Sequence, residues 1–152
     1  MEPMICGVCE SLVGASKRAP IWQDDLWHVR HADAPYGAAG WLMLISKRHV
    51  AGPAHFDDAE AASFGPTLRR VSKTLEEVTG ALRIYVAAMG ESHPHFHMHL
   101  VPRRAQMPND AKAWSVFDLQ RAAQAGEVRV AERDVASIVE ALTVALATPV
   151  DR

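Results

Sequence analysis

The sequence predicts an α+β fold in which helices pack on an antiparallel sheet. Three observations lead to this prediction. Several short segments of strand type lie in the first hundred residues, two longer segments have helical periodicity, and the two kinds do not alternate regularly. Neighbouring strands with short links and no such alternation favour antiparallel pairing. A length of 152 residues favours one domain, with a core at about 5–104 and a C-terminal extension and helix at 105–152.

The strands are predicted from short runs of apolar and β-branched residues between turn residues. Asp24-Asp25 reads as a tight turn between the first two of them. The run at 41–45 is continuously apolar, so we expect it to be covered on both faces. The predicted strands cover residues 21–23, 26–31, 41–45, 82–89 and 95–101.

Two amphipathic helices are predicted from apolar residues spaced three and four apart. The first follows Asp57-Asp58, which can cap its N-terminus, and Gly80 is a natural stop. We expect Glu60 on its acidic surface, and Gly65-Pro66 to kink or split it. The second covers residues 131–147 and closes the chain.

Composition and charge exclude several classes of protein. Hydrophobic residues make up 49% and charged residues 22%, which excludes a collagen-like or disordered chain. A net charge of −2 argues against a nucleic acid polymer or an anionic membrane as partner. No apolar run approaches the roughly 18 residues of a membrane span, and the first residues do not resemble a secretory signal. We therefore expect a cytoplasmic protein.

Four of the eight histidines fall in residues 92–103. On a strand, alternate side chains share a face, so His95, His97 and His99 are expected to line one face. A solvated polar face is the alternative, although such faces usually draw on Thr, Lys, Glu and Ser. Near pH 7, histidine is both a neutral nucleophile and a proton donor. Such a row suits attack on phosphorus through a phosphoramidate, with backbone N–H groups and the Ser92 hydroxyl just upstream to hold phosphate oxygens.

The segment His95-Phe96-His97-Met98-His99-Leu100-Val101 resembles the motif of the histidine triad (HIT) family. Gly90-Glu91-Ser92 is similar to the family's Gly-Gln-Ser, and Ile45-Ser46-Lys47-Arg48-His49 to its Ile-Pro-Lys-x-His. The resemblance implies an α+β fold with about five antiparallel strands, one long central helix and a C-terminal helix, usually in a homodimer. It also implies hydrolysis or transfer at the α-phosphate of nucleotide conjugates such as dinucleoside polyphosphates or nucleoside phosphoramidates.

The same resemblance assigns roles to single residues. His97 would be the nucleophile that forms a nucleotidyl-histidine intermediate, and His99 would assist at the phosphate and the leaving group. His95 would be the first histidine of the catalytic triad. Ser92 would hydrogen-bond phosphate, with Glu91 beside it. Asp33 lies where family members often carry an Asp that binds the ribose hydroxyls; a loop Asp that makes a turn is the alternative. A transferase branch related to the family carries Gln at the position of His99. The histidine here favours hydrolysis over transfer to a second phosphate.

Cys6-Gly7-Val8-Cys9 has the spacing of a metal knuckle, but two cysteines supply only half of the four ligands that zinc prefers. A redox pair of thioredoxin type should follow a strand, and the five residues before Cys6 leave no room for a strand of normal length. Two ordinary small side chains are the remaining alternative. The resemblance to the zinc-bearing bacterial-type branch implies His49 and His95 as the other ligands. One structural Zn²⁺ per chain would follow.

The sequence departs from the family pattern near the predicted site. Trp41 stands where many members have His, and Glu91 replaces Gln. These departures motivate a second hypothesis, a nucleotide-binding regulatory module with little turnover. A third hypothesis is a zinc-binding interaction protein in which the whole histidine row holds metal.

Overall fold

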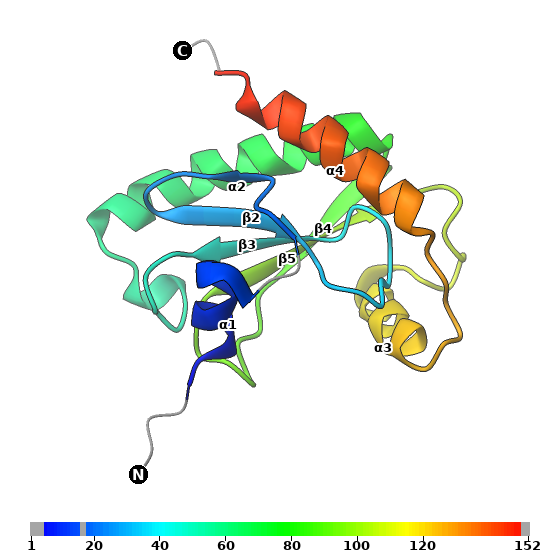
Figure 1. The fold of residues 1–152 in the computed structure, drawn as a ribbon, viewed down its shortest axis with the longest axis horizontal. Helices are drawn as coiled ribbons and strands as arrows, with labels where there is room; N and C mark the ends of the chain where they lie inside the picture. Colours follow the sequence, from blue (N-terminus) through cyan, green and yellow to red (C-terminus); the bar gives the residue numbers. More distant parts are fainter. Residues whose placement is uncertain (1–4, 16–17, 150–152) are drawn as a thin grey trace.

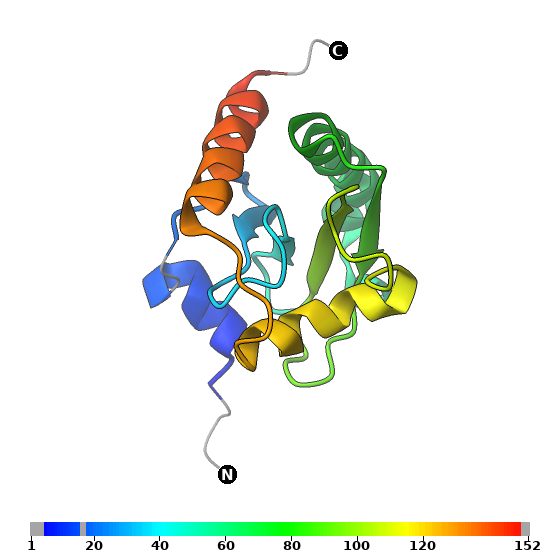
Figure 2. The same cartoon turned by 90° about the vertical axis from the view of Figure 1, so that its right-hand side faces the viewer.

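A computed structural model describes residues 5–15 and 18–149, which fold into a five-stranded sheet with helices on both sides (Figure 1). Figure 2 shows α2 and α4 together on one side of the sheet, with α1 and α3 on the other. The helices are α1 (Gly7–Glu10), α2 (Asp58–Thr79), α3 (Asp118–Gln124) and α4 (Glu132–Ala147); short turns η1 (Ser11–Ala15), η2 (Pro53–His55) and η3 (Ala113–Phe117) join them to the rest.

The strands pair antiparallel throughout, in the order β1-β2-β3-β5-β4, which confirms the predicted α+β class. The central strand β3 is buried along its whole length, as expected for a continuous apolar run. The strands are β1 (Trp22–Gln23), β2 (Trp27–His31), β3 (Leu42–Ser46), β4 (Arg83–Ala87) and β5 (His97–Arg103).

Alternation along the strands separates two apolar layers. Leu42, Leu44 and Leu100 are fully buried and belong to the main core, which includes residues of α2 and α4. The opposite face carries a smaller cluster around Trp41 and Val101, to which Val116 and Leu119 of the η3–α3 segment contribute. That segment covers only part of its face, and the candidate site lies beside it.

The long helix α2 begins at a capping box. The Asp57 side chain accepts a hydrogen bond from the Glu60 backbone N–H, and the Glu60 side chain accepts one from the Asp57 backbone N–H. The helix ends at Gly80, whose φ of 63° is left-handed. Pro66 lies inside the helix and does not split it.

The expectation that Glu60 lies on the surface is wrong. Its side chain is only 1% exposed, because the Arg48 guanidinium covers it with hydrogen bonds of 3.0 and 2.7 Å. This ion pair lowers the pKa of Glu60. It also ties the turn after β3, which carries His49, to the first turn of α2.

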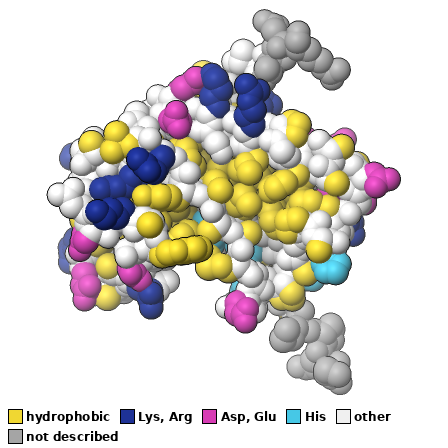
Figure 3. Space-filling view, turned by 180° about the vertical axis from the view of Figure 1, so that it is seen from behind, with side chains coloured by type: hydrophobic (Ala, Val, Ile, Leu, Met, Phe, Trp, Pro, Cys, Tyr) yellow, Lys and Arg dark blue, Asp and Glu magenta, His cyan; other side chains and the backbone are white. Residues whose placement is uncertain are grey.

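Strand β4 is an edge of the sheet and the least buried of the longer strands. Leu82, Val86 and Met89 lie on or next to it and are 63%, 47% and 61% exposed. Figure 3 shows the molecule from behind, and hydrophobic side chains are spread over this face. The same face lies at the right of Figure 2, where β4 and α2 are seen. An apolar edge strand of this kind is open to pairing with another strand.

Candidate active site and metal centre

Two triad histidines share the sheet face opposite α2 and α4, as predicted. In the register of β3 and β5, His97 lies opposite Ile45 and His99 opposite Met43. The expectation that His95 belongs to the same strand row is wrong, because β5 begins at His97. Just before the strand, the His95 backbone N–H donates to the carbonyl of His93 instead of a neighbouring strand.

The hydrogen bond of His97 determines which ring nitrogen is available. Its Nδ1 lies 2.7 Å from the backbone oxygen of His95. Because a carbonyl oxygen only accepts, Nδ1 carries the proton and Nε2 keeps its lone pair in the neutral ring. The side chain lines a cavity of about 280 Å³ together with Gly7 and Val8 of α1. His97 therefore brings a nucleophilic nitrogen to this cavity.

The ring of His99 has the opposite arrangement. The Nε1–H of Trp41, which can only donate, is bonded to His99 Nδ1 at 3.0 Å. Nε2 of the neutral ring therefore carries the proton. Burial, assisted by the neighbouring His97, lowers the pKa of His99 to about 4, so the ring is a neutral N–H donor near pH 7. Trp41 itself is 2% exposed and also packs edge-on against Phe117.

Four potential ligands meet at one end of the sheet. Atoms from Cys6, Cys9, His49 and His95 all lie within 4.8 Å of one another. Cys9 Sγ is 3.3 Å from Nδ1 of His49 and 3.3 Å from Nδ1 of His95, and Cys6 Sγ is 3.6 Å from the latter. The structure thus brings together all four residues of the predicted zinc site.

The donor set fits a zinc ion. Nε2 of His95 donates to the backbone oxygen of Ser46 at 2.6 Å, which leaves the Nδ1 lone pair on the side of the two sulfurs. Burial lowers the pKa of His95 and so favours the neutral form that binds metal. Two sulfurs and two imidazole nitrogens make a closed tetrahedral shell of structural type. Within residues 5–15 and 18–149, this is the one cluster of three or more such ligands, and neither His97 nor His99 belongs to it.

The candidate substrate-binding residues are all exposed, but only Asp33 lines a cavity beside the triad. Asp33 lines a second cavity, of about 290 Å³, together with Trp41 and His99, and its Oδ2 is 3.2 Å from Arg30. Glu91 and Ser92 are exposed on the loop before β5, and neither lines the cavities beside the triad.

Sequence reasoning missed two contributors to these cavities. Gln120 lies on α3, a helix that was not predicted, and lines the cavity beside His99. Val116, Leu119 and Ala123 are buried at spacings of three and four, and this pattern was the available signal. Arg30 was not singled out either, although it lines both cavities.

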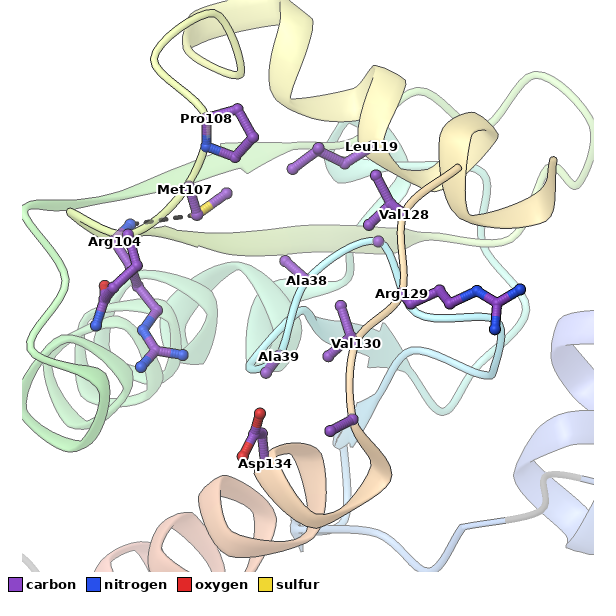
Figure 4. Close-up of a pocket in the computed structure, with 13 residues that line it drawn as sticks. Ala38, Ala39, Arg104, Met107, Pro108, Leu119, Val128, Arg129, Val130 and Asp134 are labelled. Carbon is purple, nitrogen blue, oxygen red and sulfur yellow. Dashed lines mark hydrogen bonds between the residues drawn. The ribbon is translucent and has the colours of Figure 1, made fainter. Parts of the chain in front are cut away.

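A larger cavity, of about 480 Å³, lies away from the histidines (Figure 4). Ala38 and Ala39 approach it from the loop before β3, and Val128 and Val130 from the segment before α4, with Arg104 on another side. None of the predicted catalytic or metal-binding residues lines it. Its walls combine apolar side chains with Arg104, Arg129 and Asp134.

The structure is an antiparallel α+β domain, and its triad histidines carry one lone pair and one N–H beside the cavities. This combination is characteristic of a histidine triad protein. Comparison with known proteins agrees. The HIT domain matches residues 15–106, more than half of the sequence, and the chain belongs to the HIT family. The match begins after Cys6 and Cys9, so half of the metal cluster lies outside it. The family comprises nucleotide-binding hydrolases and transferases, with some non-catalytic members.

Solved structures share the fold at low sequence identity. A hypothetical histidine triad nucleotide-binding protein from Sulfolobus tokodaii is 14% identical, with a TM-score of 0.68 over 93% of this chain and 92% of its own. A Zn-bound histidine triad family protein from Mycobacterium smegmatis is 20% identical, with a TM-score of 0.67 over 95% and 94%. A histidine triad protein from Bradyrhizobium japonicum is 23% identical, with a TM-score of 0.62 over 82% and 87%.

Comparison with curated protein sequences gives no significant match. Among the described residues, no helix is both long and apolar enough to cross a membrane.

Proposed function

We propose that the protein hydrolyses nucleotide conjugates at the α-phosphate through a nucleotidyl-histidine intermediate on His97. The observation that carries the proposal is that two imidazole rings on one sheet face have opposite tautomers. His97 keeps a lone pair on Nε2, and His99 keeps a proton on Nε2. A nucleophile beside a neutral hydrogen-bond donor is the arrangement that a displacement at phosphorus requires.

The proposed reaction has two steps. His97 Nε2 attacks the α-phosphorus, so a P–N bond forms while the bond from phosphorus to the leaving group breaks, and the electron pair of that bond goes to the leaving group. His99 donates a hydrogen bond to the phosphoryl or leaving-group atom. Water then attacks the same phosphorus: a P–O bond forms, the P–N bond breaks and its electron pair returns to His97 Nε2. One proton of the water passes to the solvent, and the nucleoside monophosphate leaves with His97 regenerated.

Three further residues are proposed to contact the substrate. Asp33 would accept hydrogen bonds from ribose hydroxyls, which is supported by its position in the cavity that contains His99. Ser92 would donate to a phosphate oxygen, with Glu91 next to it. The support for these two is their place on the exposed loop that leads directly into β5.

We propose that the four-ligand cluster holds one structural Zn²⁺ per chain. Such an ion would tie α1 to the end of β3 and to the residues before β5, which places the triad strand. A Zn-bound relative with the same fold supports the proposal. A closed shell of two cysteines and two histidines leaves no position for substrate water, so the chemistry is assigned to His97 and His99.

A homodimer is proposed through the β4 edge. The exposed Leu82, Val86 and Met89 form an apolar margin beside unpaired backbone groups of that strand. The same strand of a second copy would cover the apolar side chains and form hydrogen bonds with the unpaired backbone groups.

The experiment incubates the protein with diadenosine polyphosphates, an adenosine phosphoramidate and a nucleotide sugar. We expect release of AMP that is lost in His97→Ala and kept in His55→Ala, an exposed histidine outside the site. Rapid quenching should trap a nucleotidyl group on the wild type and on His55→Ala, but not on His97→Ala. Equal turnover by His97→Ala would refute the mechanism.

The second candidate is a nucleotide-binding regulatory module, favoured by Trp41 and Glu91 where the family pattern has His and Gln. It predicts AMP binding without a product that depends on His97. A zinc-binding interaction protein built on the whole histidine row predicts two or more metal ions per chain. The described cluster, which contains only the first histidine of the row, favours one ion.

A further inference from the structure

The two cavities beside the triad meet at the same pair of side chains. Arg30 and Met43 line both the cavity that contains His99 and the cavity that contains His97. In the sheet register Arg30 lies opposite Met43, and Met43 lies opposite His99. The two cavities therefore lie side by side across strands β5, β3 and β2, and Arg30 and Met43 stand where they meet.

The guanidinium of Arg30 is buried, but only some of its N–H groups have a hydrogen-bond or ion-pair partner. The residue is 9% exposed, and its NH1 group donates to the backbone oxygen of His31 and pairs with Asp33, both at 3.2 Å. Its Nε–H is buried and, within the described chain, has no acceptor. A buried donor without an acceptor is rare in folded proteins and calls for an explanation.

A second unpartnered atom lies next to it. His28, two residues earlier on the same strand face, is 5% exposed, and its Nε2 also has no partner among the described residues. Burial, together with the nearby Arg30 and Lys47 charges, lowers the pKa of His28 to about 4 and keeps the ring neutral. Arg30 thus has one buried N–H without an acceptor among the described residues, while Asp33 pairs with its NH1 group.

An anionic oxygen group is the ligand that a guanidinium fits best, because its planar N–H groups match phosphate geometry. The α-phosphate is already assigned to His97. Strands β2 and β5 are two strand spacings apart, about 10 Å, a distance that one or two further phosphate groups span.

We propose that Arg30 binds a second anionic group of the substrate, beyond the α-phosphate. This inference rests on the proposed function and narrows the class of substrates expected for it. The preferred substrates are nucleotide conjugates with a charged phosphate chain, such as dinucleoside polyphosphates, rather than nucleoside phosphoramidates, whose leaving group carries no phosphate.

The test compares Arg30→Gln with the wild type on diadenosine triphosphate and on adenosine 5′-phosphoramidate. We expect kcat/KM for the triphosphate to fall about 10- to 100-fold more than kcat/KM for the phosphoramidate, the range of a lost hydrogen bond to a charged group. The loss on the phosphoramidate measures the effect that passes through Asp33, which pairs with Arg30. Arg30→Lys keeps the charge and should keep part of the preference.

Arg103→Gln is the matched control. Arg103 is also a 9% exposed arginine on a strand, also donates through NH1 to a backbone oxygen at 3.2 Å, and lines neither cavity. It should leave the ratio of the two substrates unchanged. Equal losses on both substrates in Arg30→Gln, or a ratio like that of the control, would overturn the inference.

A binding measurement separates this inference from the proposed catalysis. Calorimetry on His97→Ala should show ADP binding about 10-fold tighter than AMP, and adding Arg30→Gln should remove that preference. If the wild type turns over nothing but the preference depends on Arg30, the anion site stands and the catalytic proposal fails. If turnover depends on His97 but neither ratio depends on Arg30, the anion site fails alone.

Discussion

Replacing Trp41 by Phe tests how the ring state of His99 is set. The substitution keeps an aromatic ring beside Phe117 and removes the indole N–H that is bonded to His99 Nδ1 at 3.0 Å. Nothing else in the site donates to that nitrogen within the described chain. We expect His99 to populate both neutral tautomers in the variant.

The size of the effect follows from the burial of both groups. A neutral hydrogen bond contributes about 1 kcal/mol, which is a factor of about five in the tautomer ratio. A buried acceptor left without a donor costs about 1–3 kcal/mol, and the smaller ring adds a packing loss at a position that is 2% exposed. We therefore expect a stability loss of about 2–4 kcal/mol and, if His99 acts as a donor, a several-fold fall in kcat.

Long-range ¹⁵N–¹H spectra of imidazole-labelled protein report the tautomer directly, and thermal unfolding reports the stability. Trp27→Phe is the matched control, because the Trp27 indole donates to Ser63 Oγ at 2.8 Å and is fully buried in the main core, on the sheet face away from Trp41 and His99. It should lose comparable stability without changing the His99 signals. Unchanged His99 signals in Trp41→Phe, beside a similar stability loss, would refute the reasoning.

Three other predictions concern the metal, pH and assembly. Cys9→Ser should lower zinc content by elemental analysis from about one ion per chain to a small fraction, with a lower Tm; full zinc content would remove Cys9 from the ligand set. His28 and His99 have folded pKa values of about 4 against an ordinary 6.5. The unfolded chain therefore binds more protons between these values. The stability contributed by each histidine is complete above pH 6.5 and falls by about 3 kcal/mol toward pH 4 in denaturant titrations; a flat profile would contradict this. Val86→Lys should convert a dimer to a monomer by analytical ultracentrifugation, whereas Val144→Lys, on an exposed position of α4, should not.

Much of the fold could be predicted because periodicity is local. The long helix, its Asp57 cap and its Gly80 stop follow from residues within a few positions of each other. The seven-residue α3 is too short for its buried spacing to be decisive. The buried state of Glu60 depends on Arg48, twelve residues away, and no local pattern reports it.

The site could be predicted only in part, for a similar reason. Alternation correctly placed His97 and His99 on one face. His95 lies just before the strand, and its ring Nε2 donates to the Ser46 backbone oxygen, a contact between distant segments that no local pattern reports. The Trp41–His99 bond and the position of Arg30 both depend on how β3 pairs with its neighbours, which the sequence does not reveal without the register.

Helix α1 contributes to both proposed sites, so the proposed zinc would be coupled to the affinity for the proposed nucleotide ligand. Cys6 and Cys9 belong to the metal cluster, while Gly7 and Val8 between them form part of the wall beside His97. An ion that holds this helix in place also builds that wall, so zinc and nucleotide should each tighten the binding of the other. Such linkage is reciprocal by thermodynamic necessity. In a zinc-poor medium the protein would therefore retain its metal best when its nucleotide ligand is abundant.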